Sequence, residues 1–240
     1  MSALPAAPSR HPSGHFIRTC PLLMNLDEYK ARYGADQSAA PGWDAIDERL
    51  KQFYPGVEPM HYASTVKFAL GGPDPLDGIS IYRCGPPDNW HFHYVSYGFS
   101  SLYYAEQAVG KDFSGFGFEL TFRLKPFAGD HEWPTWPVKV MQNLARYVFQ
   151  SRKWFEDHHW IPAGGPIRAD TQTEITGAAF VTDPQLGLIH TPHGRVQFLQ
   201  MVGITTAELV AIQGGTLEVK ALLEQLAARD PLLVTDLTRR

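Results

Sequence analysis

Cysteine is almost absent from this chain. Its 240 residues include two cysteines, Cys20 and Cys84, which lie far apart and in no CxxC pattern. A scaffold held together by disulfide bonds is therefore not expected, and a reducing compartment is. We predict a cytoplasmic protein, because the N-terminus lacks a secretory signal and no apolar run is long enough to span a membrane.

Clusters of basic residues are lacking as well. The chain has 21 Lys and Arg residues against 25 Asp and Glu residues, a formal net charge of −4. A mildly acidic chain of this kind argues against nucleic acid as the main partner. Aromatic residues are somewhat abundant at 12%, while the 44% of hydrophobic residues is ordinary for a globular protein.

Motifs of common catalytic sites are also missing. The segment Gly98–Leu102 places Ser100 after a glycine but lacks the second glycine of a nucleophile elbow. Gly115-Phe116-Gly117 opens a predicted strand rather than a helix, so it lacks the helix N-terminus that would bind a pyrophosphate. We therefore predict a protein that is not an enzyme and that requires no cofactor.

A pair of histidines is the main argument for an enzyme instead. His91 and His93 lie two residues apart on a predicted strand, so their side chains share one face about 6–7 Å apart. Such a pair binds zinc or iron when a third ligand is added. Candidates for that ligand are His158, His159, His190 and His193. A metal-dependent hydrolase stays the alternative to a chain without a metal, in which both histidines are core residues.

The chain divides into an N-terminal extension, residues 1–41, and one domain, residues 42–240. Residues 1–20 contain three prolines and three serines, so we expect a loose tail there. A short helix is expected over residues 26–33, and the small residues of 35–42 are typical of a linker.

Hydrophobic spacing predicts an α+β domain, with a mixed sheet flanked by helices. Helical spacing marks residues 43–53, 137–154 and 217–229, and a capping box at Thr205–Glu208 begins another helix that ends at Gly214. Alternating or continuous apolar runs predict strands at 62–70, 79–81, 90–97, 116–125, 174–182, 195–203 and 232–234.

Two of these strands have distinctive faces. Segment 90–97 is aromatic on both faces, which predicts a central strand covered on both sides. Segment 116–125 alternates between apolar and polar residues, which predicts one polar, solvent-facing side. We expect Glu119 and Arg123 to form a weak ion pair on that side.

Several stretches of the chain resemble the suppressor-of-fused family. They include Leu70–Asp77, Trp90–Gly98 and Ser114–Lys125, and further matches follow in family order as far as residue 237. The resemblance implies the fold of the family's N-terminal domain. In animal members, that domain is one half of a protein that restrains a transcription factor of the Hedgehog pathway, whose peptide is held as an added strand between the halves. We expect the second half to be missing here.

The resemblance also implies a partner. Stand-alone members look bacterial, and their suggested role is that of immunity proteins that neutralise a toxin. We therefore expect non-catalytic binding of another protein or peptide, with a cognate toxin as the specific hypothesis. A regulatory subunit that binds a peptide by strand addition is a further alternative. The sequence does not indicate an oligomeric state.

Two residues are candidates for partner binding through the resemblance. Tyr103 matches the tyrosine of the family's Leu-Tyr pair, and Asp112 stands near the position of an acidic binding residue. We add Trp90, Tyr97 and Glu119 from neighbouring strands, since aromatic side chains suit binding surfaces. For each of the five, the alternative is a role in packing.

Overall fold

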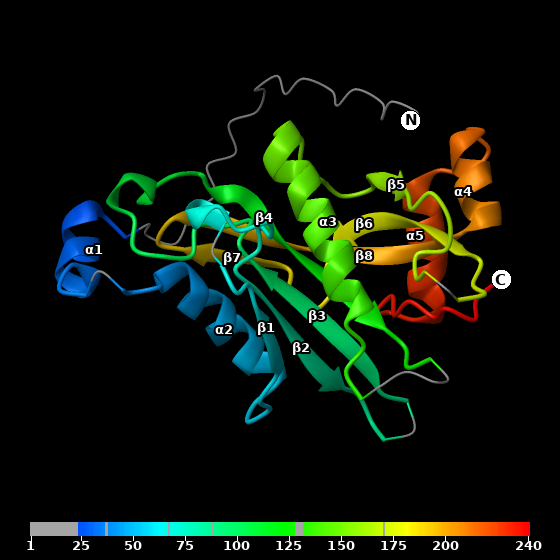
Figure 1. Ribbon diagram of the computed structural model, residues 1–240, viewed down its shortest axis with the longest axis horizontal. Coiled ribbons are helices and arrows are strands. Elements are labelled where there is room, and N and C mark those ends of the chain that lie inside the picture. Colours follow the sequence, from blue (N-terminus) through cyan, green and yellow to red (C-terminus); the bar gives the residue numbers. More distant parts are fainter. Residues whose placement is uncertain (1–23, 37, 67, 88, 128–131, 170) are drawn as a thin grey trace.

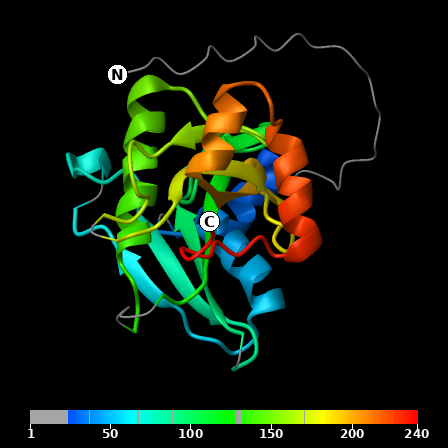
Figure 2. The same ribbon diagram turned by 90° about the vertical axis from the view of Figure 1, so that its right-hand side faces the viewer.

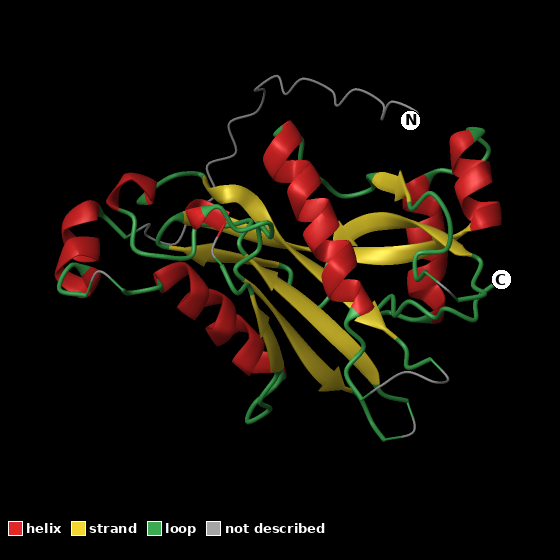
Figure 3. Cartoon of the chain, viewed as in Figure 1, coloured by secondary structure: helices red, strands yellow, loops and turns green. Residues whose placement is uncertain are grey.

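The computed structural model describes the whole chain except residues 1–23, 37, 67, 88, 128–131 and 170. The tail expected at residues 1–20 lies outside the described residues. The described chain forms three layers, in which one mixed sheet lies between helices on both of its faces (Figures 1 and 3). The predicted α+β architecture is confirmed.

The sheet has eight strands, in the order β1-β2-β3-β4-β8-β6-β5, and β7 pairs with the start of β8. Strands β4 and β8 run parallel, and the other paired strands of the described residues are antiparallel. The strands are β1 (Met60–Ala63), β2 (Gly78–Cys84), β3 (His91–Tyr97), β4 (Phe113–Leu124), β5 (Trp160–Pro162), β6 (Ile175–Thr182), β7 (Leu188–Thr191) and β8 (Gly194–Thr205).

Helices cover the two faces unequally. Helix α3 (Trp136–Ser151) packs on one face, whereas α2 (Pro41–Phe53) and α5 (Val219–Arg229) pack on the other (Figure 2). Helix α4 (Thr206–Gln213) directly follows β8, and its start has the predicted capping box between Thr205 and Glu208. Helix α1 (Leu26–Tyr33) lies where the short N-terminal helix was expected.

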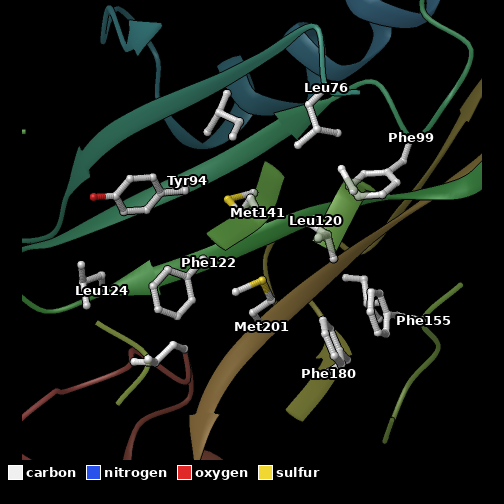
Figure 4. Packing of buried hydrophobic residues seen from close by; sticks show 14 of the residues in the cluster. Leu76, Tyr94, Phe99, Leu120, Phe122, Leu124, Met141, Phe155, Phe180 and Met201 are labelled. Atoms are coloured by element: carbon white, nitrogen blue, oxygen red, sulfur yellow. The ribbon is translucent and has the colours of Figure 1, made fainter. Parts of the chain in front are cut away.

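The main core lies between the sheet and α3. Figure 4 shows Leu120 and Phe122 of β4 facing Met141 of α3, with Phe180 of β6 beside Phe155. Strand β3 is buried along its whole length, so the prediction of a central strand covered on both sides is confirmed.

Strand β4 differs from its prediction. Its apolar residues face α3 as expected, but the polar residues Glu119, Thr121 and Arg123 are fully buried on the opposite face. The expectation of a solvent-facing polar side is therefore wrong. The reason is that α2 and the loop after β6 cover this face, while Tyr54, directly after α2, and Asp183 in the loop are hydrogen-bond partners of Thr121 and Arg123.

Three further differences concern the length and number of the strands. The strand predicted at 62–70 stops at Ala63, because its partner β2 begins at Gly78 opposite Ala63; a short 3-10 turn, Phe68–Leu70, follows. Residues 232–234 form no strand, and only an isolated bridge joins Leu124 to Thr235 nearby. Sequence reasoning also missed the short strands β5 and β7.

The N-terminal helix is anchored to the domain. Tyr29, the buried residue of α1, has its hydroxyl 2.8 Å from His193 Nε2 and accepts a bond from the Ala105 amide. Gly42 lies so close to the loop after β3 that an added Cβ would stand 2.1 Å from the Ser101 carbonyl oxygen. The domain boundary at residue 42 stays a prediction, and the helix in front of it packs against the same body.

Candidate functional site: an aromatic groove

A hollow of about 340 Å³ opens beside the first half of β4. We call it the aromatic groove, because phenylalanine and tryptophan side chains form most of its lining. The lining residues are Phe113, Gly115, Phe116, Gly117, Phe118, Trp154, Phe155, Glu156 and Gln197.

Two glycines give β4 the bend that shapes the groove. Gly115 and Gly117 have φ values of 57° and 86°, in the left-handed region that favours glycine. A Cβ on Gly115 would stand 2.4 Å from the Phe99 carbonyl oxygen, and one on Gly117 would press on the Phe113 ring. The pairing of β4 with β8 shifts register between Phe113 and Phe118, as expected for a bulge at these glycines.

The rim of the groove exposes two large aromatic side chains. Phe113 is 40% exposed and Trp154 is 46% exposed, although both are large apolar residues. Beneath them, Phe155 is buried and stacks on Phe180 with ring centroids 4.3 Å apart. The groove therefore has a rigid floor in the core and an apolar rim that faces water.

The histidine pair lies elsewhere, on the α2 face of the sheet. His93 Nδ1 is 2.7 Å from the Tyr54 hydroxyl, and its Nε2 is 3.1 Å from Asp183 Oδ2. Because the carboxylate can only accept, Nε2 carries the proton and Nδ1 accepts from Tyr54. We call His91, His93, Arg123, Asp183 and Tyr54 the buried polar cluster.

Arg123 joins the members of this cluster. Its guanidinium lies 3.3 Å from Asp183 and donates to His91 Nε2 at 3.1 Å. Two backbone amides, of Gln185 and Leu186, also donate to Asp183. The charges of the cluster are thus matched inside the protein.

Electrostatics keep both histidines neutral. Burial lowers the pKa of His91 and of His93 to about 4, and the Arg123 charge acts in the same direction. Burial alone would raise the pKa of Asp183, but its bonds with His93, Arg123 and Leu186 outweigh this and hold it well below its usual range. A metal ion at His91 would stand against the Arg123 cation. Within the described residues, no group of three or more His, Cys, Asp and Glu side chains is arranged to hold a metal.

Glu119 has a different role from the one expected. Its carboxyl group is fully buried and accepts from the hydroxyls of Ser96 and Ser100 and from the amides of Gly98 and Ser100. The predicted ion pair with Arg123 is wrong, because Arg123 pairs with Asp183 instead. Burial raises the pKa of Glu119, although the hydrogen bonds act against this. Glu119 therefore fixes the start of the loop after β3.

The five predicted partner-binding residues do not form one surface. Tyr97 is buried and donates to Asp47, and Trp90 lies beyond the opposite end of β3 with the Arg83 guanidinium 3.8 Å from its ring. Tyr103 is half-buried against the core near α2. Asp112 is exposed and directly precedes Phe113. Of the five, Asp112 adjoins the aromatic groove, and whether any of them binds a partner stays a prediction.

Sequence reasoning missed the residues that shape the groove. Phe113 and Trp154 come from distant parts of the chain: Phe113 is the first residue of β4, and Trp154 lies in the loop after α3. The Gly115-Phe116-Gly117 motif lacks the helix N-terminus of a pyrophosphate site, yet its glycines form the bend. The helix predicted at 137–154 ends at Ser151, so Trp154 lies in the loop after it, and an aromatic residue at the end of the predicted helix was the available signal.

Comparison with known proteins identifies the family of this chain. The family model for Suppressor of fused protein (SUFU) matches residues 72–240. The chain belongs to the suppressor-of-fused family. The family predicted from the sequence is thereby confirmed.

Relatives of this suppressor-of-fused chain include longer proteins. The human and mouse proteins named Suppressor of fused homolog are each 41% identical over 209 residues, which is 82% of this chain and 43% of theirs. The chain thus spans less than half the length of these curated relatives.

Solved structures show the same fold. A chain of the Sufu–Fu complex matches with a TM-score of 0.76 and 33% identity, covering 84% of this chain and 92% of that one. Drosophila Suppressor of Fused matches with a TM-score of 0.74 at 33% identity, over 84% of this chain and 51% of that one. A homologue from Neisseria gonorrhoeae, 16% identical with a TM-score of 0.52 over 83% of this chain and 95% of its own, shares the fold.

None of the helices among the described residues combines the length and the apolar character needed to cross a bilayer.

Proposed function

We propose that this chain is a non-catalytic protein-binding domain that holds a segment of another protein in the aromatic groove. The observation that carries the proposal is the exposure of Phe113 and Trp154, at 40% and 46%, on the rim of one hollow. Exposed aromatic side chains around a preformed pocket are typical of the anchor points of protein interfaces. The buried Phe155 gives such an anchor a fixed floor.

The relatives support binding of a protein. One matched structure is a complex of Sufu with Fu, and this chain covers 92% of the matched chain. The region that corresponds to this chain is therefore present in an assembly of a relative with a protein partner.

Side-chain anchoring fits the groove better than strand addition. The backbone of β4 at the groove is already bonded on both sides, since Phe116 N donates to the Phe99 carbonyl and Phe113 is paired with Arg195. Strand addition, the alternative raised by the sequence, would instead use a strand that is paired on one side, such as β1, β5 or β7.

The identity of the partner is the finer part of the proposal. We rank a regulatory protein ahead of a toxin. The relatives at 41% identity are named for suppression of fused, and a relative at 33% identity is solved with Fu. The homologue from Neisseria gonorrhoeae supports the fold alone. Neutralisation of a toxin by an immunity protein stays the second version of the same proposal.

A peptide-display selection tests the proposal without a known partner. Random 12-residue peptides would be selected on the immobilised full chain, and the affinity of the enriched peptides would be measured in solution. We expect a loss of at least tenfold in the double variant Phe113→Ser/Trp154→Ala. Val210→Ala, which removes an exposed apolar side chain on α4, is the matched control and should bind normally.

Two results would overturn the proposal. One is the absence of any enriched peptide. The other is equal affinity of the enriched peptides for the wild type and the groove variant, with circular dichroism showing that both are folded.

A further inference from the structure

Two arginine side chains lie against the aromatic residues of the groove. The Arg195 guanidinium carbon is 4.6 Å from the centre of the Phe113 ring, and that of Arg152 is 5.9 Å from the centre of the Phe116 ring. These are cation–π distances. Both arginines are exposed, so their remaining N–H groups face water.

The backbone holds both arginines in place. Arg152 is the C-cap of α3, with φ at 59° in the left-handed region, and its amide donates to the Val148 carbonyl. Arg195 lies opposite Phe113 in the β4–β8 register, and its Nε donates to the Asp112 carbonyl at 3.3 Å. The Arg195 guanidinium is thus preorganised and binds a carboxylate at a lower entropy cost than a free lysine does, while the backbone places Arg152 beside the groove.

Nearby carboxylates are largely engaged within the protein. Glu156 accepts a bond from the Trp154 indole at 3.1 Å. Asp157 accepts from Thr182 Oγ1 and from Gln197 Nε2. The third, Asp112, bonds Arg195 through its backbone carbonyl.

The sequence adds to the cationic character of the rim. Lys111 precedes Asp112 and Lys153 follows Arg152, and both lysines are exposed. Four cations therefore stand against three carboxylates in the segments that border the groove, in a chain whose net charge is −4. Two of those carboxylates accept hydrogen bonds from groups other than the two arginines, and the side chains of Arg152 and Arg195 are exposed to an external anion.

We infer that the groove recognises a protein segment in which an apolar or aromatic anchor is flanked by Asp or Glu. This inference rests on the proposed function and specifies the chemistry of its partner. The anchor packs between Phe113 and Trp154, and the flanking carboxylates accept paired N–H bonds from Arg152 and Arg195. The two guanidinium groups keep their stacking on the rings while they bind, so the apolar and ionic contacts reinforce each other.

Three sets of synthetic peptides test the inference. Each has a central Trp or Leu in a Ser/Gly background, flanked by Asp and Glu, by Asn and Gln, or by Lys. Binding to the full chain is measured by fluorescence anisotropy. We expect the acidic set to bind at least tenfold more tightly than the amide set at low salt, with the difference shrinking in 1 M NaCl.

Charge reversal provides the matched comparison. Arg152→Glu/Arg195→Glu should lose the acidic preference and bind the Lys set instead. The control Arg229→Glu makes the same charge change per site at the exposed end of α5 and should keep the wild-type preference.

The outcomes separate this inference from the proposed function. Equal binding of the acidic and amide sets, or an acidic preference that survives the double reversal, would overturn the inference. If none of the three sets binds while display-selected peptides still depend on Phe113 and Trp154, the inference fails and the groove function stands. If the selected peptides bind the wild type and the Phe113→Ser/Trp154→Ala variant equally well, both the inference and the proposed function fail.

Discussion

The aromatic groove and the buried polar cluster lie on opposite faces of the sheet and use their residues in opposite ways. In the cluster, Arg123 and His93 are fully buried, and both lie within 3.3 Å of the Asp183 carboxylate. In the groove, Phe113 and Trp154 leave apolar surface in water. The cluster thus keeps its charged groups inside the protein, whereas the groove exposes apolar aromatic surface on its rim. The difference teaches that exposed apolar surface around a hollow, rather than reactive residue types, marks the better candidate for binding.

Lowering the pH should cause the largest loss of stability, through the two histidines of the buried polar cluster. The pKa of His91 and His93 is about 4 in the folded protein, below the ordinary value of 6.5. Between these pH values, the histidines bind protons in the unfolded chain but not in the folded protein. The free energy of unfolding therefore has its full histidine contribution above pH 6.5 and falls as the pH drops towards 4. At about 1.4 kcal/mol per pKa unit, the loss is on the order of 3 kcal/mol for each histidine.

Urea unfolding at a series of pH values measures this loss. The midpoint should fall between pH 6.5 and 4.5, and His91→Gln should reduce the slope. A midpoint that stays constant over this range would show that the histidines are not held neutral by burial.

Removing the carboxylate of the buried polar cluster should cause the second-largest loss of stability. Asp183→Ala leaves the Arg123 charge buried without its carboxylate, which costs about 3–5 kcal/mol in the free energy of unfolding. Glu224→Ala breaks an exposed pair with Lys220 and should cost less than about 1 kcal/mol. If urea unfolding shows the same loss in the free energy of unfolding for both variants, the Asp183 carboxylate is not needed to compensate the buried Arg123 charge.

Local patterns predicted the framework of both regions. The apolar alternation of β4, the aromatic β3 and the capping box at Thr205 depend on neighbours in sequence, so spacing was enough to predict them. The partners of Arg123 and Glu119 were different. Asp183 and Ser100 come from other segments, and no periodicity of β4 indicates that its polar face is covered.

The groove was beyond sequence reasoning for a related reason. It requires a bend at Gly115 and Gly117 together with the end of α3, which are brought together only by the fold. Family resemblance directed attention to the loop that ends at Asp112, next to the groove, but not to the groove itself.

A second buried polar site should respond less strongly than the cluster. Glu119→Gln replaces a group that only accepts by one with two N–H donors, which would face the amides of Gly98 and Ser100 or the Ser96 hydroxyl. We expect a loss of about 2 kcal/mol in the free energy of unfolding. The exposed Glu58→Gln serves as the control and should change stability by less than about 0.5 kcal/mol.

The smallest effect on stability is expected at the groove, and it provides the sharpest test of the comparison. Trp154→Ala removes a large side chain that is 46% exposed and whose indole donates one hydrogen bond to the half-buried Glu156, so the free energy of unfolding should fall by less than about 1 kcal/mol. The adjacent Phe155→Ala empties the groove floor and should cost about 3–5 kcal/mol. If the two variants unfold at the same urea concentration, Trp154 is a packing residue like its neighbour. A small stability change together with lost peptide binding means that folding does not need this tryptophan, and that its aromatic surface is available to a partner.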